Sequence, residues 1–182
     1  MERKKLIIIG AGGHGKVLAD IVCAQDHYHL VGFVDASLPV GTSVITEFKV
    51  VESQDRIDFL KSDIDCFIVA IGNNIIRERV YNQLSSLFEP AVIIHPSSII
   101  GSDVIIGKGT VVLPNSVINA SSIIGENCLI NTGVIIDHDC EIGNHVHFGV
   151  GSLIGSNSCI ESFRTTTVGE IVSPFSTFDS NE

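Results

Sequence analysis

The sequence predicts two unlike halves: an α/β domain over residues 1–90 and an all-β parallel β-helix over residues 91–160. In the first half, short β-branched runs alternate with amphipathic segments, which is the pattern of βαβ units around a parallel sheet. In the second half, a large apolar residue returns at every sixth position, which is typical of short strands stacked as coils. The composition agrees, because 17 Gly with no Trp and one Met favour tight turns and disfavour a helical bundle.

The elements of the first half follow from local patterns taken in chain order. Strands are expected at 6–9, 29–34 and 66–71, where apolar residues, many of them β-branched, run up to a glycine or an aspartate. Helices are expected at 17–22, 53–60 and 75–88, and in the last of these Ile76, Val80 and Leu84 recur on one face. The segment 37–50 shows no readable pattern.

The second half is a hexapeptide repeat. The residue two before each large apolar position is small or β-branched, and both point inward because side chains alternate along a strand. Gly or Asn at the corners accepts left-handed backbone angles at little cost. Three hexads make one triangular coil, so the repeat supplies between three and four coils, and a sandwich of evenly spaced strands would not keep its register. The twelve apolar positions are Ile94, Ile100, Ile106, Val112, Ile118, Ile124, Ile130, Ile136, Ile142, Phe148, Ile154 and Ile160.

The register is expected to fail after Ile160. The next positions at this spacing are Arg164 and Thr166, neither of which fits the pattern, and three phenylalanines follow within 161–182. We therefore expect residues 161–182 to form an atypical tail, either a cap, a poorly ordered end, or a truncated or frameshifted one.

Charge and cysteine usage exclude several classes of protein. The formal charge of −10, from 11 Lys+Arg against 21 Asp+Glu, argues against binding to a nucleic-acid backbone. A hydrophobic content of 45% predicts a buried core, yet no apolar run reaches the ~18–20 residues of a membrane span. The odd number of cysteines without a CxxC pair favours free thiols in a reducing cytoplasm over disulfides or a zinc site. The five cysteines are Cys23, Cys66, Cys128, Cys140 and Cys159.

A glycine-rich turn marks a candidate phosphate site. Gly10-x-Gly12-x-x-Gly15 follows a strand and opens a helix, where backbone N–H groups can hold a phosphate. Asp35, at the end of the second strand, is placed to bind ribose hydroxyls, although such carboxylates are often merely exposed. Because only one mononucleotide half precedes the β-helix, a nucleotide-sugar suits the domain better than NAD.

His138 is the candidate general base. It lies between Asp137 and Asp139 at a corner of the coil, and a neighbouring carboxylate can orient an imidazole and raise its basicity. His147 falls at an outward position, where an ordinary surface histidine is as good an interpretation. His145 is expected to be a surface residue.

These motifs together resemble a known family. The strand leading into Gly10-Ala11-Gly12-Gly13-His14-Gly15-Lys16, the strand Val31-Gly32-Phe33-Val34-Asp35, His95-Pro96 before the hexads, and 131–143 resemble the bacterial sialic acid O-acetyltransferase family. Within it they are most similar to acetyltransferases of nucleotide-linked 4-amino-4,6-dideoxy sugars. The resemblance covers roughly residues 4 to 158. It implies a Rossmann-like N-terminal domain, a left-handed β-helix, acetyl-CoA as co-substrate and a homotrimer.

The resemblance also implies roles for individual residues. His138 matches the proton acceptor, Asp139 the acidic residue that tunes it, and Asn131 an active-site residue that helps to hold the substrate amine. A contact with acetyl-CoA is implied for His147, Gly149 and Gly151. Contacts with the nucleotide-sugar are implied for Gly12, Gly13, His14, Asp35 and Gly72. Ala36 departs from the family, in which a polar residue commonly follows that aspartate.

Three functions stay open on these grounds. The first is acetyl-CoA-dependent N-acetylation of a UDP- or dTDP-linked 4-amino-4,6-dideoxy sugar for bacterial surface polysaccharide. The second is O-acetylation of sialic acid or another sugar. The third is a catalytically impaired nucleotide-sugar-binding protein, since members of the family usually continue for further hexads that contact coenzyme A. A zinc site like that of hexapeptide-repeat carbonic anhydrases is not expected, because His138, His145 and His147 are crowded together instead of stepping from coil to coil.

Overall fold

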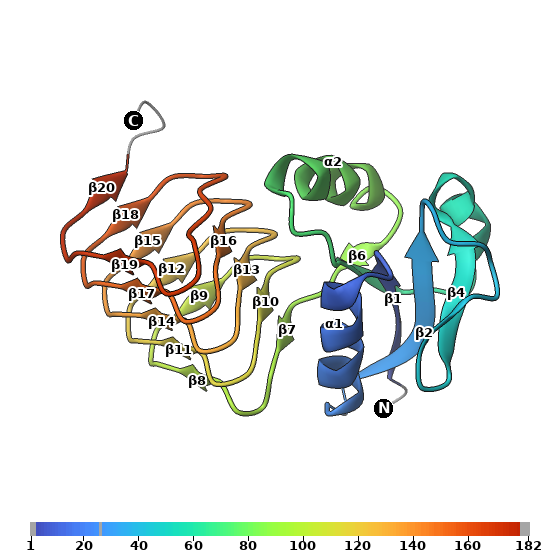
Figure 1. Ribbon diagram of the computed structural model, residues 1–182, viewed down its shortest axis with the longest axis horizontal. Coiled ribbons are helices and arrows are strands. Elements are labelled where there is room, and N and C mark those ends of the chain that lie inside the picture. Colours follow the sequence, from blue (N-terminus) through green and yellow to red (C-terminus); the bar gives the residue numbers. More distant parts are fainter. Residues whose placement is uncertain (1–2, 26, 179–182) are drawn as a thin grey trace. The chain divides into compact units, whose positions relative to one another are not determined.

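The chain divides into two compact units, Met1–Ile93 and Ile94–Glu182, as shown by a computed structural model that describes residues 3–25 and 27–178 (Figure 1). The first unit is an α/β domain and the second a parallel β-helix. Both architectures confirm the fold predicted from the strand–helix alternation and from the hexads.

The α/β unit is built on a six-stranded sheet in the order β3-β4-β2-β1-β5-β6. Neighbouring strands are parallel except β3 and β4, which form an antiparallel pair in the segment that the sequence left unread. The strands are β1 (Lys4–Ile9), β2 (Tyr28–Asp35), β3 (Ser43–Ile45), β4 (Phe48–Ser53), β5 (Cys66–Val69) and β6 (Glu89–Pro90).

Helices cover both faces of this sheet. Helix α2 (Asn74–Leu84) and the 3-10 helix η1 (Gln54–Leu60) pack on the face that carries Ile7 and Ile9. Leu6 and Ile8 alternate with them and are equally buried under α1 (Gly13–Cys23) on the opposite face (Figure 1). The expected helix at 53–60 is thus a 3-10 helix, and the one at 75–88 ends at Leu84.

The β-helix unit has three walls of two-residue parallel strands. The first wall contains β7 (Ile93–Ile94), β10 (Val111–Val112), β13 (Leu129–Ile130) and β16 (His147–Phe148). The second wall contains β8 (Ile99–Ile100), β11 (Val117–Ile118), β14 (Ile135–Ile136), β17 (Leu153–Ile154) and β19 (Ile171–Val172). The third wall contains β9 (Ile105–Ile106), β12 (Ile123–Ile124), β15 (Glu141–Ile142), β18 (Cys159–Ile160) and β20 (Thr177–Phe178).

The repeat builds the interior of the β-helix in the predicted way. From Val112 to Ile160 the apolar residue of every hexad is buried, together with the small residue two before it. Inward hydroxyl groups are satisfied by backbone, as where Ser116 donates to Asn131 O at 2.8 Å and Ser122 to Asp137 O at 2.7 Å. The core therefore admits polar residues wherever a carbonyl of the next turn can accept their proton.

Each corner places one residue in the left-handed backbone region. These residues recur every six positions from Asp103 to Phe175, with φ between 53° and 73°. The Asn, Asp and Gly residues among them are expected there. The non-glycine members are Asp103, Asn115, Ser121, Asn127, Asp139, His145, Asn157, Phe163 and Phe175.

The expectation that the register fails after Ile160 is wrong. Thr166 and Val172 occupy the next two inward positions and are 3% and 2% exposed. Strand β19 pairs with β17 and β20 with β18, so the coil continues through 178. The apolar pattern missed this turn because Thr166 satisfies its hydroxyl inside the core, where Oγ1 accepts from Gly149 N at 2.8 Å and pairs with Ser152 Oγ at 2.8 Å. Residues 179–182 of the predicted tail lie outside the described part.

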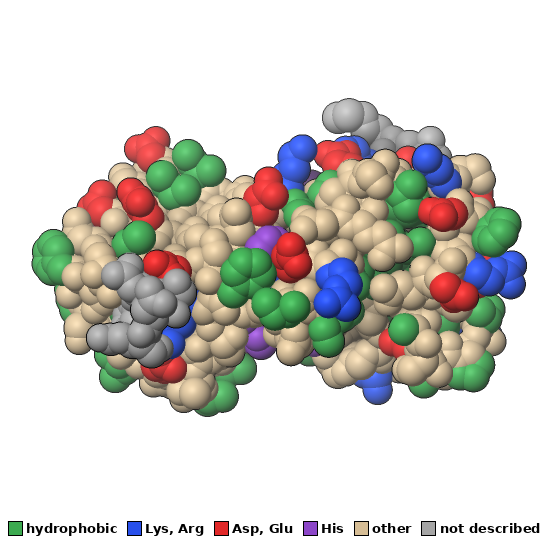
Figure 2. Space-filling model, turned by 90° about the horizontal axis from the view of Figure 1, so that it is seen from above, with side chains coloured by type: hydrophobic (Ala, Val, Ile, Leu, Met, Phe, Trp, Pro, Cys, Tyr) green, Lys and Arg blue, Asp and Glu red, His purple; other side chains and the backbone are tan. Residues whose placement is uncertain are grey.

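All five cysteines are free, and Cys66, Cys128 and Cys140 are buried. Burial raises the pKa of the Cys66 thiol to about 12. Among the described residues, no helix combines the length and apolarity needed to cross a membrane. On the face of the β-helix unit seen in Figure 2, acidic side chains predominate over basic ones.

Candidate active site

The glycine-rich turn lies where β1 meets α1. Gly10 has a φ of +105°, and a side chain at Gly15 would place its Cβ 2.2 Å from the Gly10 carbonyl oxygen, so both positions require glycine. Open space surrounds the corresponding positions of Gly12 and Gly13. Gly10 and Gly15 therefore shape the turn, whereas Gly12 and Gly13 leave the backbone accessible to a ligand at the start of α1.

Asp35 is bonded to this turn. Its Oδ2 accepts from Ala11 N at 2.9 Å, and its Oδ1 accepts from Ser37 N, Ser37 Oγ and Leu38 N at 2.8, 2.8 and 3.1 Å. Burial alone would raise the pKa of Asp35, but these hydrogen bonds lower it below its usual value. The carboxylate therefore ties the end of β2 to the glycine turn, a contact that the sequence did not predict.

Gly72 follows β5 at the same carboxyl edge of the sheet, and a buried arginine fixes its backbone. Arg77 of α2 is fully buried, and its Nη1 donates to Ile71 O and Gly72 O, both at 3.2 Å. Asn73 caps α2, its side chain accepting from Ile76 N at 3.0 Å. Sequence reasoning missed Arg77, because a lone arginine on a helix gives no sign that it points into the core. His14 is the second residue of α1 and partly exposed.

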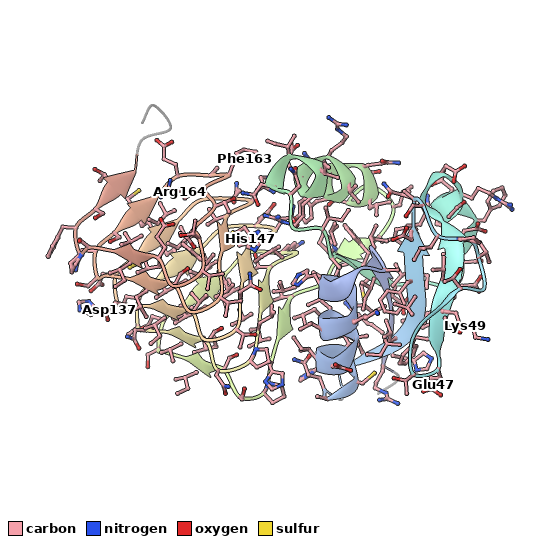
Figure 3. All side chains as sticks on the ribbon, in the orientation of Figure 1. Glu47, Lys49, Asp137, His147, Phe163 and Arg164 are labelled. Atoms are coloured by element: carbon pink, nitrogen blue, oxygen red, sulfur yellow. The ribbon has the colours of Figure 1, made fainter. Side chains whose placement is uncertain are left out.

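His138 and Asp139 form the turn between β14 and β15, at the corner of the second and third walls. His138 Nδ1 lies 2.6 Å from Asp139 Oδ2, and the two side chains are 52% and 54% exposed. Asp139 holds the left-handed position of this corner, with φ of 56°. Asp137, labelled in Figure 3, accepts from His138 N at 2.9 Å and from Asn119 Nδ2 at 3.0 Å.

The acidic neighbours make His138 a better base. The hydrogen bond that His138 Nδ1–H donates to Asp139 raises the pKa of His138 most, the charges of Asp137 and Asp139 raise it further, and desolvation opposes them. The pKa of Asp137 is lowered by the hydrogen bonds from His138 N and Asn119. When Nδ1–H donates to Asp139, the lone pair of Nε2 faces away from the pair and can accept a proton.

Asn131 contacts His147 and not His138. Its Nδ2 lies 2.8 Å from His147 Nε2 and 2.8 Å from Phe148 O, just after β13 on the first wall. Figure 3 shows His147 and Asp137 at separate corners of the coil. The candidate residues of the β-helix thus fall into two groups at the opposite ends of the second wall.

Gly149 and Gly151 adjoin His147 at the corner between the first and second walls. A Cβ on Gly149 would lie 2.6 Å from Thr167 O, and Gly151 has a φ of +68°. Gly149 N donates to the Thr166 hydroxyl, so the last coil holds this stretch in place. Within residues 3–25 and 27–178, no group of three His, Cys, Asp or Glu residues could hold a metal ion.

Comparison with known proteins identifies the family. The PglD N-terminal domain family matches residues 5–84, and the bacterial transferase hexapeptide family matches residues 121–156. GDP-perosamine N-acetyltransferase of Escherichia coli O157:H7 is 33% identical over 175 residues, which cover 91% of this chain and 76% of that enzyme. This chain belongs to the nucleotide-amino-sugar N-acetyltransferase family.

The chain is also similar to a second curated enzyme and to two solved structures. UDP-N-acetylbacillosamine N-acetyltransferase of Bacillus subtilis (strain 168) is 31% identical over 112 residues, 59% of this chain, and the match spans half of that enzyme's length. The acetyltransferase domain of PglB from Neisseria gonorrhoeae FA1090, solved with acetyl coenzyme A, has a TM-score of 0.75 at 29% identity and covers 97% of this chain and 96% of that one. PerB from Caulobacter crescentus, solved with CoA and GDP-perosamine, has a TM-score of 0.72 at 27% identity, covering 96% and 88%.

Proposed function

We propose that this protein transfers the acetyl group of acetyl-CoA to the amine of a nucleotide-linked 4-amino-4,6-dideoxy sugar. The observation that carries the proposal is the His138–Asp139 pair, 2.6 Å apart at an exposed corner of the β-helix, in a chain of this family. The relatives are named for amine acetylation of UDP- and GDP-linked sugars. The product would serve surface polysaccharide synthesis.

The chemistry needs one proton acceptor. The sugar amine attacks the thioester carbon of acetyl-CoA, and the new C–N bond forms as His138 Nε2 removes a proton from the nitrogen. The C–S bond then breaks, and the proton passes to the departing thiolate to give CoA and the amide. Asp139 stabilises the imidazolium that exists between these steps, and binding both substrates in one orientation supplies much of the rate.

The α/β unit would hold the nucleotide. Diphosphate oxygens would accept from backbone N–H groups at Gly12, Gly13 and His14, where α1 begins and the space is open. Gly72 would contact the same ligand from the neighbouring turn. Asp35 would act on the nucleotide by ordering the glycine turn, since its oxygens already accept four hydrogen bonds, and by any further contact with the ribose.

Acetyl-CoA would bind near His147, Gly149 and Gly151, which requires a second copy of the chain. His138 and His147 stand at opposite ends of the second wall, separated by about five residues of extended backbone, roughly 16 Å at the rise of a strand. One thioester cannot touch both corners of one coil. The two groups serve one reaction when neighbouring copies bring unlike corners together, as in a homotrimer.

The second wall offers the surface for this assembly. Its outward residues form a continuous aliphatic column, in which Ile99 is 62% and Ile171 71% exposed. The column consists of Ile99, Val117, Ile135, Leu153 and Ile171. Ile135→Glu should convert the trimer into monomers in size-exclusion chromatography with light scattering, and should abolish acetyl transfer. Ile123→Glu, a matched change on the third wall, should leave the trimer intact; a trimer in both variants would exclude the second wall as the interface.

The deciding experiment follows thiol release from acetyl-CoA with UDP-, dTDP- and GDP-linked 4-amino sugars as acceptors. His138→Ala should lower kcat by roughly 10²–10⁴-fold, the usual contribution of a general base. Isothermal titration should show that the variant still binds the nucleotide-sugar. His145→Ala alters a histidine at another corner of the β-helix and should remain active. Retained turnover in His138→Ala, or a preference for sugar hydroxyls over amines, would overturn the proposal.

The alternative that this chain is a catalytically impaired nucleotide-sugar-binding protein is the weaker interpretation. It rested on the loss of coils after Ile160, whereas the turn from Arg164 to Val172 packs on His147 and Gly149.

We further propose a cytoplasmic location, which the five free thiols support because disulfides seldom form in reducing compartments.

A further inference from the structure

Phe175 is a bulky residue in a strained and exposed position. It lies in the turn between β19 and β20 (Figure 1), and its φ of 58° falls in the left-handed region. That region is unfavourable for a bulky side chain, and the ring is 74% exposed, so its burial does not offset the strain. The phenylalanine at another corner, Phe163, differs, because its ring packs against His145 with the centroids 4.9 Å apart. A residue that serves the fold so poorly points to a role in binding.

The backbone that carries Phe175 is fixed by the coil beneath it. Phe175 N donates to Ser156 O at 2.9 Å. A Cβ on Gly155 would lie 2.5 Å from Pro174 N, so the two successive turns are in close contact. The ring therefore projects from a rigid turn, which suits a binding surface better than a flexible loop does.

Phe175 stands on the same corner of the β-helix as the His138–Asp139 pair. The left-handed positions Asp139, Asn157 and Phe175 follow one another at intervals of one full coil and form a column along this corner. The coils are joined directly, as where Asn157 N donates to His138 O at 3.1 Å. At the usual spacing of parallel strands, Phe175 lies roughly 10 Å from Asp139 along the column.

The side chains of this column follow the order of the groups in acetyl-CoA. The thioester must lie at His138, Asn157 presents an exposed amide one coil further, and Phe175 presents an aromatic ring one coil beyond that. In acetyl-CoA the thioester is followed by the amides of the pantetheine arm and then, after the diphosphate, by adenine. The arm has about twelve backbone bonds, as many as about four residues, and spans roughly 14 Å when extended. It can therefore pass Asn157 and reach the last coil.

We propose that Phe175 is the surface on which the adenine of acetyl-CoA stacks while the thioester lies at His138 of the same copy. The inference rests on the proposed function and deepens it. The nucleotide of the sugar is assigned to the glycine turn, so coenzyme A is the substrate whose base has no binding surface yet. Ile171, the exposed end of the second wall, precedes this turn, so the stacking surface lies at the edge of the proposed trimer interface.

The test compares acetyl-CoA with S-acetylpantetheine, which carries the thioester but lacks the adenine nucleotide. Phe175→Leu keeps an apolar side chain and removes the aromatic face. It should raise the KM of acetyl-CoA, and the Kd of free CoA in calorimetry, roughly 5- to 100-fold, the range of one base–aromatic stack. The KM of S-acetylpantetheine should not change. Phe175→Tyr keeps the aromatic face and should bind CoA as the wild type does.

Phe175→Asn separates binding from a structural role. Asparagine tolerates left-handed backbone, so this variant should be more stable than the wild type and yet bind CoA as weakly as Phe175→Leu. A ring that only supports the fold would give the opposite result, with lower stability and an unchanged Kd of CoA.

Phe163→Leu is the matched control, because it removes another ring from a left-handed corner and should leave the Kd of CoA unchanged. Equal losses with acetyl-CoA and S-acetylpantetheine, or an unaltered Kd of CoA in Phe175→Leu, would overturn the inference. So would a monomeric Phe175→Leu in light scattering, which would assign the ring to the trimer contact, or an effect confined to the KM of the nucleotide-sugar. Failure of the proposed function would appear separately, as Phe175-dependent binding of CoA without thiol release.

Discussion

Thr166 provides the sharpest test of how the last coil is attached. Thr166→Val keeps the shape of the side chain and removes its hydroxyl, which accepts from Gly149 N and pairs with Ser152 Oγ in the core. Ser152 keeps its bonds to Gly149 O and Thr167 O, at 2.8 and 3.1 Å. The main loss is therefore the acceptor of one buried backbone N–H.

The size of the effect follows from two opposing terms. Leaving a buried N–H without its acceptor costs about 1–3 kcal/mol. Replacing the hydroxyl with a buried methyl group returns about 0.8 kcal/mol. The net loss should be about 1.2 kcal/mol, which in a unit of this size corresponds to a fall of about 5–10 °C in Tm.

Thermal unfolding followed by circular dichroism measures this change. Thr166→Ser keeps the hydroxyl and should lose less, whereas Thr110→Val should lose a similar amount, because Thr110 Oγ1 accepts from Cys128 N and donates to Gly125 O in an inner coil. The reasoning would be refuted by a Thr166→Val variant as stable as the wild type beside a destabilised Thr110→Val.

Three further variants test other parts of the account. Asp139→Asn removes the main cause of the raised pKa of His138, so the limb of the kcat/KM profile that rises with pH should move to lower pH. The plateau of kcat/KM should fall roughly tenfold, which is part of the ~10²–10⁴-fold supplied by a general base. If the rising limb of the kcat/KM profile does not move, His138 is not the titrating base. Asp35→Asn sets an amide N–H against a backbone N–H such as that of Ala11, and should weaken nucleotide-sugar binding in calorimetry without changing the KM of acetyl-CoA. Phe175→Asn should raise Tm by a few degrees, because Phe175 is 74% exposed and left-handed backbone costs a bulky residue about 1–2 kcal/mol; a lower Tm would show that the ring is needed.

The sequence predicted those features that local chemistry controls. The glycine turn and the hexads could be found because backbone angles and side-chain alternation restrict the residues at each position, as the left-handed φ of Asp139 shows. The sequence did not predict the hairpin of β3 and β4, because its short strands have no long alternation of apolar and polar residues. The sequence did not predict the turn at Thr166, because a hydroxyl group can replace a methyl group in the core when it has hydrogen-bond partners.

The candidate site depended on contacts between successive coils. Asn131 and His147 are sixteen residues apart, close to the eighteen of one full coil, and Asn127 and His145 are separated by eighteen. Polar pairs at this spacing in the sequence could have signalled both contacts. Arg77 carries no such signal, because its partners are carbonyl groups of the turn before its own helix.

The central claim is that His138 serves the transfer of an acetyl group to the amine of a nucleotide-linked sugar. Incubation with [¹³C]acetyl-CoA and a nucleotide-linked 4-amino sugar, followed by mass spectrometry and NMR of the product, tests it most directly. The account predicts one labelled acetyl group in an amide bond to the sugar nitrogen with the wild type, and an initial rate of labelling roughly 10²–10⁴-fold lower with His138→Ala. A label on a hydroxyl, or equal labelling by the variant, would contradict it.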